Sequence, residues 1–89
     1  MVKIYEVDPK KSLQDIMFDA WEQYPIVFIN GIPHRTLLLT LAYDFKNDIY
    51  EIYKKSDSYF ESPIAIYTAQ DIKEVIGYEK VTMFSRETD

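Results

Sequence analysis

SLQDIMFDAWEQYPIVFINGIP, residues 12–33, changes its hydrophobic period at Pro25, and that change decides the fold. The apolar side chains before Pro25 form one helical stripe: Leu13, Ile16, Met17, Ala20, Trp21 and Tyr24. Ser12 precedes the stripe at the position of a helix N-cap. Asp15 follows three residues later, in the first turn, where the helix dipole stabilises a carboxylate. The spacing therefore predicts a helix that begins after Ser12 and ends before Pro25.

After Pro25 the period shortens to two, which is typical of β-strands. IVFI (26–29) is rich in β-formers, and the Asn30-Gly31 pair that follows favours a type I′ turn with positive φ at both central residues. Pro33 cannot donate a ladder hydrogen bond, so it belongs at a strand start or a sheet edge. The sequence thus predicts a tight hairpin.

The flanking sequence predicts further strands with the same alternation: residues 2–7, 36–45, 49–55, 64–68 and 80–84. Lys46-Asn47-Asp48 is the expected turn between two of them. A helix over 37–46 fits part of the same pattern and is the alternative there.

TAQDI (68–72) nearly repeats SLQDI (12–16) and predicts a second helix. Thr68 and Asp71 repeat the capping pattern, and Gly77 stands where the end of a helix favours positive φ. The apolar stripe of this helix would be Ala69, Ile72, Val75 and Ile76. We interpret the shared letters as two helix starts, with the relic of a duplicated β-α-β unit as the alternative.

The resulting order is β-α-β-β-β-β-α-β, an α+β fold. We expect one domain over residues 1–85, with a mixed or mainly antiparallel sheet of about five or six strands and two helices on one face, and a disordered tail over 86–89. The expected core residues are Ile16, Trp21, Leu39, Leu41, Val75 and Ile76. The other face of the sheet would stay partly uncovered, where some of the eight tyrosines would suit it.

The composition is that of a small folded protein. With 89 residues, 47% hydrophobic and 28% charged, the chain can build one modest core. It has no cysteine, which excludes disulfides and thiolate chemistry. No signal-like segment opens it, and no apolar run approaches the roughly 20 residues that span a bilayer, so we expect a soluble cytoplasmic protein.

No catalytic or metal-binding signature is recognisable. His34 is the only histidine, we expect it on the surface at a strand start, and no serine lies in a nucleophile-elbow context. The two glycines cannot form a phosphate-binding loop. We therefore predict no enzyme, no metal and no cofactor, with a small-ligand-binding domain as an alternative.

The charge distribution is acidic and clustered. The net charge of −5 repels phosphate backbones and anionic lipids, so we expect neither direct nucleic-acid binding nor membrane binding. Between Lys11 and Arg35, leaving His34 aside, the only charged side chains are Asp15, Asp19 and Glu22. Between Lys55 and Lys73 they are Asp57, Glu61 and Asp71. Two merely solvated faces are the alternative to a functional role.

Aromatic side chains stand among these acids. Phe18 lies about 130° from the helical stripe, on the polar face, which suits an interface anchor or a ring covered by a neighbouring loop. In SDSYFESP (56–63) an aromatic pair lies between Asp57 and Glu61. Carboxylates around aromatics suit a basic protein partner, because charge steers association and the rings anchor it.

Three short motifs resemble the phage uracil-DNA glycosylase inhibitors: AYD (42–44), SD (56–57) and P-x-A (63–65), within residues 40–70. The resemblance implies a small acidic DNA mimic whose acidic edge strand enters the DNA groove of an enzyme. It also implies a cavity between sheet and helix that receives an apolar side chain. The Glu-Ser-Ile element of that family is not reproduced, so only Glu6 and Asp8 could take its acidic role.

We therefore expect a non-enzymatic, acidic protein-binding module, an inhibitor or DNA mimic acting on a basic, nucleic-acid-processing partner such as uracil-DNA glycosylase. The predicted partner-binding residues are Glu6, Asp8, Phe18, Asp19, Glu22, Phe60 and Glu61. The main alternative is a homodimer or larger homo-oligomer that pairs through a tyrosine-rich sheet face.

Overall fold

The helix predicted from SLQDI is present. In the computed structural model, which describes residues 2–7, 12–55 and 62–79, α1 spans Leu13–Gln23. The Ser12 hydroxyl oxygen accepts a hydrogen bond from the Asp15 amide at 3.3 Å, as the capping pattern predicts. Tyr24 ends the helix in an extended conformation, with its amide bonded to the Ala20 carbonyl at 3.0 Å. Pro25 follows and leads the chain into a strand.

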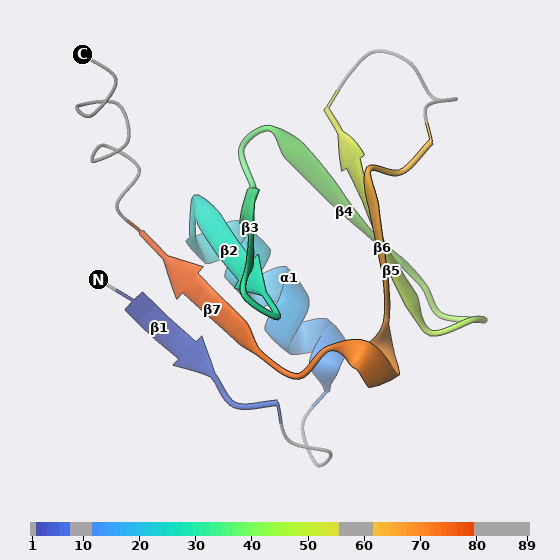
Figure 1. The fold of residues 1–89 in the computed structure, drawn as a ribbon, viewed down its shortest axis with the longest axis horizontal. Coiled ribbons are helices and arrows are strands. Elements are labelled where there is room, and N and C mark those ends of the chain that lie inside the picture. The colour runs from blue at the N-terminus through green and yellow to red at the C-terminus, as the bar shows by residue number, and fades with distance from the viewer. Residues whose placement is uncertain (1, 8–11, 56–61, 80–89) are drawn as a thin grey trace.

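A four-stranded antiparallel sheet covers one side of α1 (Figure 1). Its strand order is β1 (Val2–Tyr5), β7 (Val75–Tyr78), β2 (Ile26–Ile29) and β3 (Ile32–Arg35). The predicted hairpin joins β2 to β3, with φ of 51° at Asn30 and 83° at Gly31. Pro33 lies on β3, at the sheet edge, where its missing N–H costs no ladder bond.

A separate three-stranded antiparallel sheet has the order β4 (Leu39–Asp44), β5 (Ile49–Lys54) and β6 (Ala65–Thr68). The strand reading of this region is confirmed and the helix alternative over 37–46 is wrong. The strand is shorter than predicted because residues 36–38 form a turn. Asp44 organises the turn into β5 by accepting bonds from the Lys46 and Asn47 amides, at 3.1 and 3.3 Å.

The predicted second helix is wrong. TAQDI forms only one turn of 3-10 helix, η1 (Ala69–Asp71), and the chain then extends into β7. Strand β7 is central, paired with β1 on one side and β2 on the other. Gly77 lies within it and has no positive φ. Its Cβ position is filled instead by the ring of Tyr24, so a hydrogen is all that fits there.

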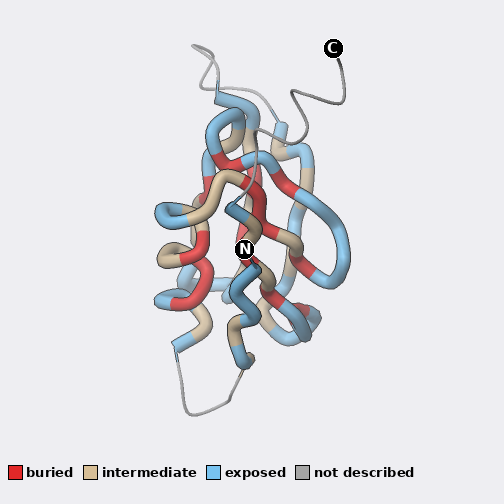
Figure 2. Tube along the Cα trace, turned by 90° about the vertical axis from the view of Figure 1, so that its left-hand side faces the viewer, coloured by how far each residue is buried: buried red, intermediate tan, exposed pale blue. Residues whose placement is uncertain are grey.

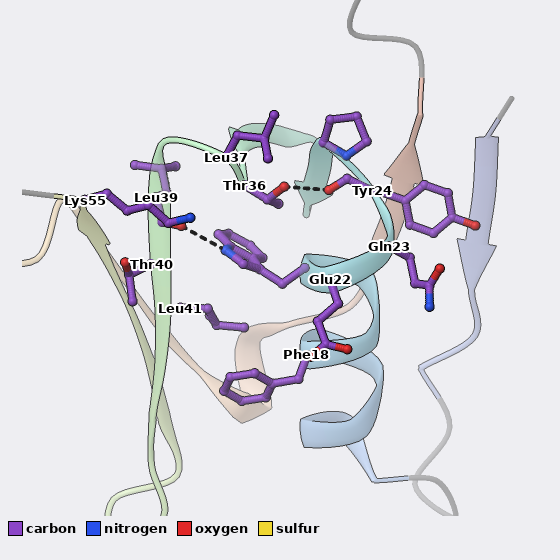
Figure 3. Close-up of a pocket in the computed structure, with 12 residues that line it drawn as sticks. Phe18, Glu22, Gln23, Tyr24, Thr36, Leu37, Leu39, Thr40, Leu41 and Lys55 are labelled. Atoms are coloured by element: carbon purple, nitrogen blue, oxygen red, sulfur yellow. Dashed lines mark hydrogen bonds between the residues drawn. The ribbon is translucent and has the colours of Figure 1, made fainter.

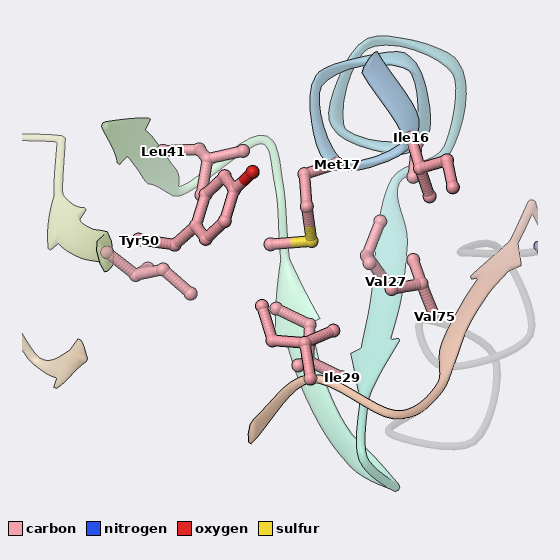
Figure 4. Packing of buried hydrophobic residues seen from close by; sticks show 10 residues of the cluster. Ile16, Met17, Val27, Ile29, Leu41, Tyr50 and Val75 are labelled. Atoms are coloured by element: carbon pink, nitrogen blue, oxygen red, sulfur yellow. The ribbon is translucent and has the colours of Figure 1, made fainter. Parts of the chain in front are cut away.

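The predicted single sheet is also wrong, because the core lies between two sheets and the helix. Met17 is fully buried and reaches from α1 between Leu41 and Tyr50 of the three-stranded sheet and Val27 of the four-stranded sheet (Figure 4). Buried stretches alternate with exposed ones along the chain, and β1 beside the N-terminus is mostly exposed (Figure 2). The α+β class stands.

The expected core is partly confirmed. Ile16, Leu41 and Val75 are buried, whereas Trp21 and Leu39 are half-buried at the margin of the cluster. Ile76 is half-buried and points to the opposite face from Val75, because both lie on a strand rather than on a helix.

The tyrosines do not gather on one open sheet face. Tyr43, Tyr50 and Tyr67 share the inner face of the three-stranded sheet by register, and the first two rings stack with centroids 4.6 Å apart. By register, the open face of the four-stranded sheet carries Val2, Ile4, Ile26, Phe28, Pro33, Arg35, Ile76 and Tyr78. Tyr78 is the single described tyrosine on that face. The predicted strand over 80–84 and the tail over 86–89 lie outside the described residues.

Candidate functional site

A groove runs between α1 and β4, where the helix faces the edge strand of the three-stranded sheet (Figure 3). Its volume is about 480 Å³. Phe18 projects from the helix toward Leu41, which projects from the strand toward the helix. The walls are mostly apolar: Phe18, Trp21, Pro25, Leu37, Leu39 and Leu41.

Two hydrogen bonds hold the walls of this groove together at the end of α1. The Trp21 indole N–H donates to the Leu39 carbonyl oxygen at 3.2 Å. The Thr36 hydroxyl donates to the Tyr24 carbonyl oxygen at 2.6 Å, and Thr36 is itself buried. The groove is therefore bounded by elements that are bonded to one another, which favours a preformed shape.

Phe18 and Glu22 lie one helical turn apart on the flank of α1 that faces β4. Phe18 is half-buried because its ring packs against the margin of the core, and Glu22 is exposed at the mouth of the groove. Lys55 stands across the groove, on the sheet side. The structure thus places one predicted aromatic and one predicted acid together.

Asp19 lies on the other flank of α1, toward β1. Its carboxylate accepts a hydrogen bond from the Tyr5 hydroxyl at 2.6 Å, beside a shallower hollow that Asp15 also lines. Burial, together with the bond to Asp19, raises the pKa of Tyr5 well above its ordinary value. Asp19 is therefore bound within the fold and separated from the groove.

The remaining predicted partner-binding residues do not join the groove. Glu6 is exposed just after β1. Asp8, Phe60 and Glu61 lie outside the described residues.

His34 is buried, so its expected surface position is wrong. Its Nδ1 lies 3.1 Å from the Val27 carbonyl oxygen, which can only accept, so Nδ1 carries the proton. Nε2 then accepts from the Tyr67 hydroxyl at 3.0 Å, and this bond ties β3 to β6. Burial lowers the pKa of His34 below its ordinary value. His34 acts as a neutral bridge between the sheets.

Within the described ranges, no three histidine, aspartate or glutamate side chains lie close enough together to hold a metal ion. None of the described helices is long and apolar enough to cross a membrane. The chain matches no protein-family model, no curated protein and no solved structure. The resemblance to the glycosylase inhibitors therefore stays a prediction.

Trp21, Leu39 and Lys55 are groove residues that sequence reasoning did not select. The apolar stripe assigned Trp21 to the core, although its indole N–H needs a hydrogen-bond partner and so belongs at a margin. That requirement is the signal that could have placed it. No local signal brings Lys55 to the helix, because only the pairing of β4 with β5 does so.

Proposed function

We propose that this protein is a non-enzymatic protein-binding module that engages a basic partner through the groove between α1 and β4. The observation that carries the proposal is the pairing of a half-buried Phe18 with an exposed Glu22 at the mouth of an apolar groove. An aromatic anchor beside a steering charge is a common arrangement at protein interfaces.

The charge of the chain favours a basic partner over nucleic acid. The described part of α1 carries acids and no Lys or Arg, within a protein of net charge −5. An acidic surface of this kind would also compete with DNA for a basic groove, so inhibition of a nucleic-acid-processing enzyme by DNA mimicry belongs to the proposal.

The test is a binding measurement with charge-neutral variants. Glu22→Gln should slow association with the partner, and so should raising the salt from about 50 to about 300 mM, because both weaken electrostatic steering. Asp15→Asn is the matched control, since it removes one exposed acid from the same helix outside the groove. A partner whose association rate ignores both salt and Glu22→Gln contradicts the proposal.

The specific inhibitor version has its own assay. Uracil excision from a labelled oligonucleotide by a bacterial uracil-DNA glycosylase is followed with and without micromolar protein. Loss of excision, reversed by Glu22→Gln, supports DNA mimicry. Full activity rejects that enzyme as the target, and tight binding of the protein itself to DNA at moderate salt rejects mimicry.

Self-association is the second candidate, favoured by the open face of the four-stranded sheet. Ile4 is 67% exposed and Val2 is 54% exposed on neighbouring positions of that face. Sedimentation of the protein with and without Ile4→Lys decides this candidate, because a dimer built on that face should dissociate.

A further inference from the structure

The edge of β4 presents main-chain groups at the groove, and their direction follows from the ladder. The Lys55 amide donates to the Leu38 carbonyl oxygen at 3.0 Å, so that carbonyl faces β5, whereas the Leu38 amide donates to the Arg35 carbonyl oxygen in the preceding turn. Main-chain directions alternate along a strand, so the N–H and C=O groups of Leu39, Leu41 and Tyr43 face away from β5.

The contact of Trp21 supports this assignment. Its indole N–H reaches the Leu39 carbonyl oxygen from the helix side, which is the outward direction that the alternation requires. Further along β4, no hydrogen-bond partner from the described residues meets the outward N–H and C=O of Leu41 or Tyr43. These four groups, which we call the β4 edge groups, form an open template for one more strand.

The template and the groove lie side by side. Leu39 and Leu41 line the groove and also belong to the inner face of the sheet. A chain paired with the β4 edge would therefore direct every second side chain toward the same side as Leu41, over Phe18. The mouth of the groove has Glu22 on the helix side, which would accept a basic side chain of that chain.

We propose that the partner enters as an extended basic segment that pairs with the β4 edge and sets alternate apolar side chains against Phe18 and Leu41. The inference rests on the proposed protein-binding function and names its mode, the addition of a strand to a sheet edge. The occupant is a peptide segment with apolar residues at every second position and at least one Lys or Arg.

Amide hydrogen exchange of the free protein is the first test. Leu41 and Tyr43 should exchange faster than Thr40 and Ala42, their neighbours on the same strand, because only the latter pair donates to β5. Equal protection of all four amides would show that the edge is already occupied. Protection of Leu41 and Tyr43 that disappears on dilution would assign the edge to a second copy of the chain. Either result overturns the proposal.

The second test uses random octapeptides displayed on phage and selected on the immobilised protein. Selected peptides should share the alternating pattern and should slow exchange at Leu41 and Tyr43 while leaving Thr40 and Ala42 unchanged. N-methylation of one central peptide amide should weaken binding about tenfold, the effect of about one hydrogen bond. Failure to enrich any peptide, or binding without protection of the two outward amides, overturns the inference.

The Glu22→Gln and Asp15→Asn pair separates this inference from the proposed function. If selected peptides protect the β4 edge groups but carry no basic residue and ignore Glu22→Gln, strand addition stands and the basic partner is wrong. If a basic partner depends on Glu22 without protecting the edge, the function stands and strand addition is wrong. A loss of about threefold or more with Glu22→Gln, and less than twofold with Asp15→Asn, supports both.

Discussion

Residues 12–23 and residues 68–78 begin with nearly the same letters and become different structures. SLQDI opens an eleven-residue helix, whereas TAQDI makes one turn of 3-10 helix before β7. In the first segment the Ser12 side chain accepts from the Asp15 amide. In the second, the Thr68 hydroxyl donates to the Asp71 carboxylate at 2.7 Å, and no side-chain cap forms.

The difference lies in what surrounds each segment. Asn30, in the β2–β3 turn, accepts the Lys73 and Glu74 amides on its Oδ1 at 2.8 and 3.1 Å. If the helix continued, those two amides would donate to carbonyl groups one helical turn earlier in the chain. The hydrogen bonds to Asn30 replace those helical bonds, which favours an extended chain after η1. The next residues, Val75 and Ile76, are β-branched and gain pairing on both sides. A capping sequence can start a helix, but tertiary contacts determine whether the helix continues past its first turn.

Met17→Ala tests whether burial rather than capping holds α1, and it should have the largest effect. Met17 is fully buried where both sheets meet the helix, so we expect a loss of about 2–5 kcal/mol in the free energy of unfolding. Urea denaturation measures it. Gln14→Ala, at an exposed position of the same helix, should stay within about 0.5 kcal/mol. Similar losses in the two variants would contradict the proposed core.

Gly77→Ala addresses the second segment. A Cβ at Gly77 would lie 2.6 Å from the Tyr24 Cγ, so β7 or the ring must shift, at about 1–3 kcal/mol. Tyr24→Ala removes the ring, and in that background Gly77→Ala should cost much less. Additive losses in this double-mutant cycle would mean that the close approach does not restrict Gly77.

Asn30→Ala should release the segment before β7. The Asn30 side chain accepts hydrogen bonds from the Lys73 and Glu74 amides and donates one to the Asp71 carbonyl oxygen at 2.7 Å. Its removal should lower the free energy of unfolding by about 1–2 kcal/mol. Asn30→Asp keeps the acceptor and should recover part of the loss. Faster amide exchange at Lys73 and Glu74 in the alanine variant is the local readout, and unchanged exchange there would count against this role of Asn30.

Lowering the pH should weaken the contact between β3 and β6, the strand that leads into TAQDI. The expected loss in the free energy of unfolding is smaller than for the substitutions above. Tyr67 on β6 donates to neutral His34, whose pKa burial lowers from 6.5, so the unfolded chain takes up a proton more readily than the folded one. Burying His34 in its neutral form costs no stability above about pH 6.5, where the histidine is neutral in the unfolded chain as well. Below that pH the unfolded chain binds the proton, so the free energy of unfolding falls as the pH drops toward the pKa of His34 in the folded protein. Unfolding free energies measured between pH 7.5 and 5.5 should decline, and His34→Gln should flatten the decline. An unchanged slope in that variant would assign the loss to other groups.

The same comparison marks what the sequence could predict. The helix after Ser12, the Asn30-Gly31 hairpin and the edge position of Pro33 follow from local rules, and all three are present. The division into two sheets does not follow, because period-two segments do not encode which strands pair. The site splits in the same way: helical spacing brings Phe18 near Glu22, while the β4 wall and the Tyr5 bond that removes Asp19 depend on long-range packing.

Alanine substitution at the first residue of each copy of the motif, Ser12 and Thr68, should have the smallest effects and gives the most selective test. Ser12→Ala removes a formed cap and should cost about 1 kcal/mol, whereas Thr68→Ala removes an exposed bond to Asp71 and should cost less than about 0.5 kcal/mol. Ser12→Asp should retain the stability, since aspartate caps equally well. The loss measured for Thr68→Ala is the more informative of the two. If it were as large as the loss for Ser12→Ala, the Thr68 hydroxyl would have to cap η1. The helix would then be initiated at both sites, and only the capture of the Lys73 and Glu74 amides by Asn30 would stop the second one.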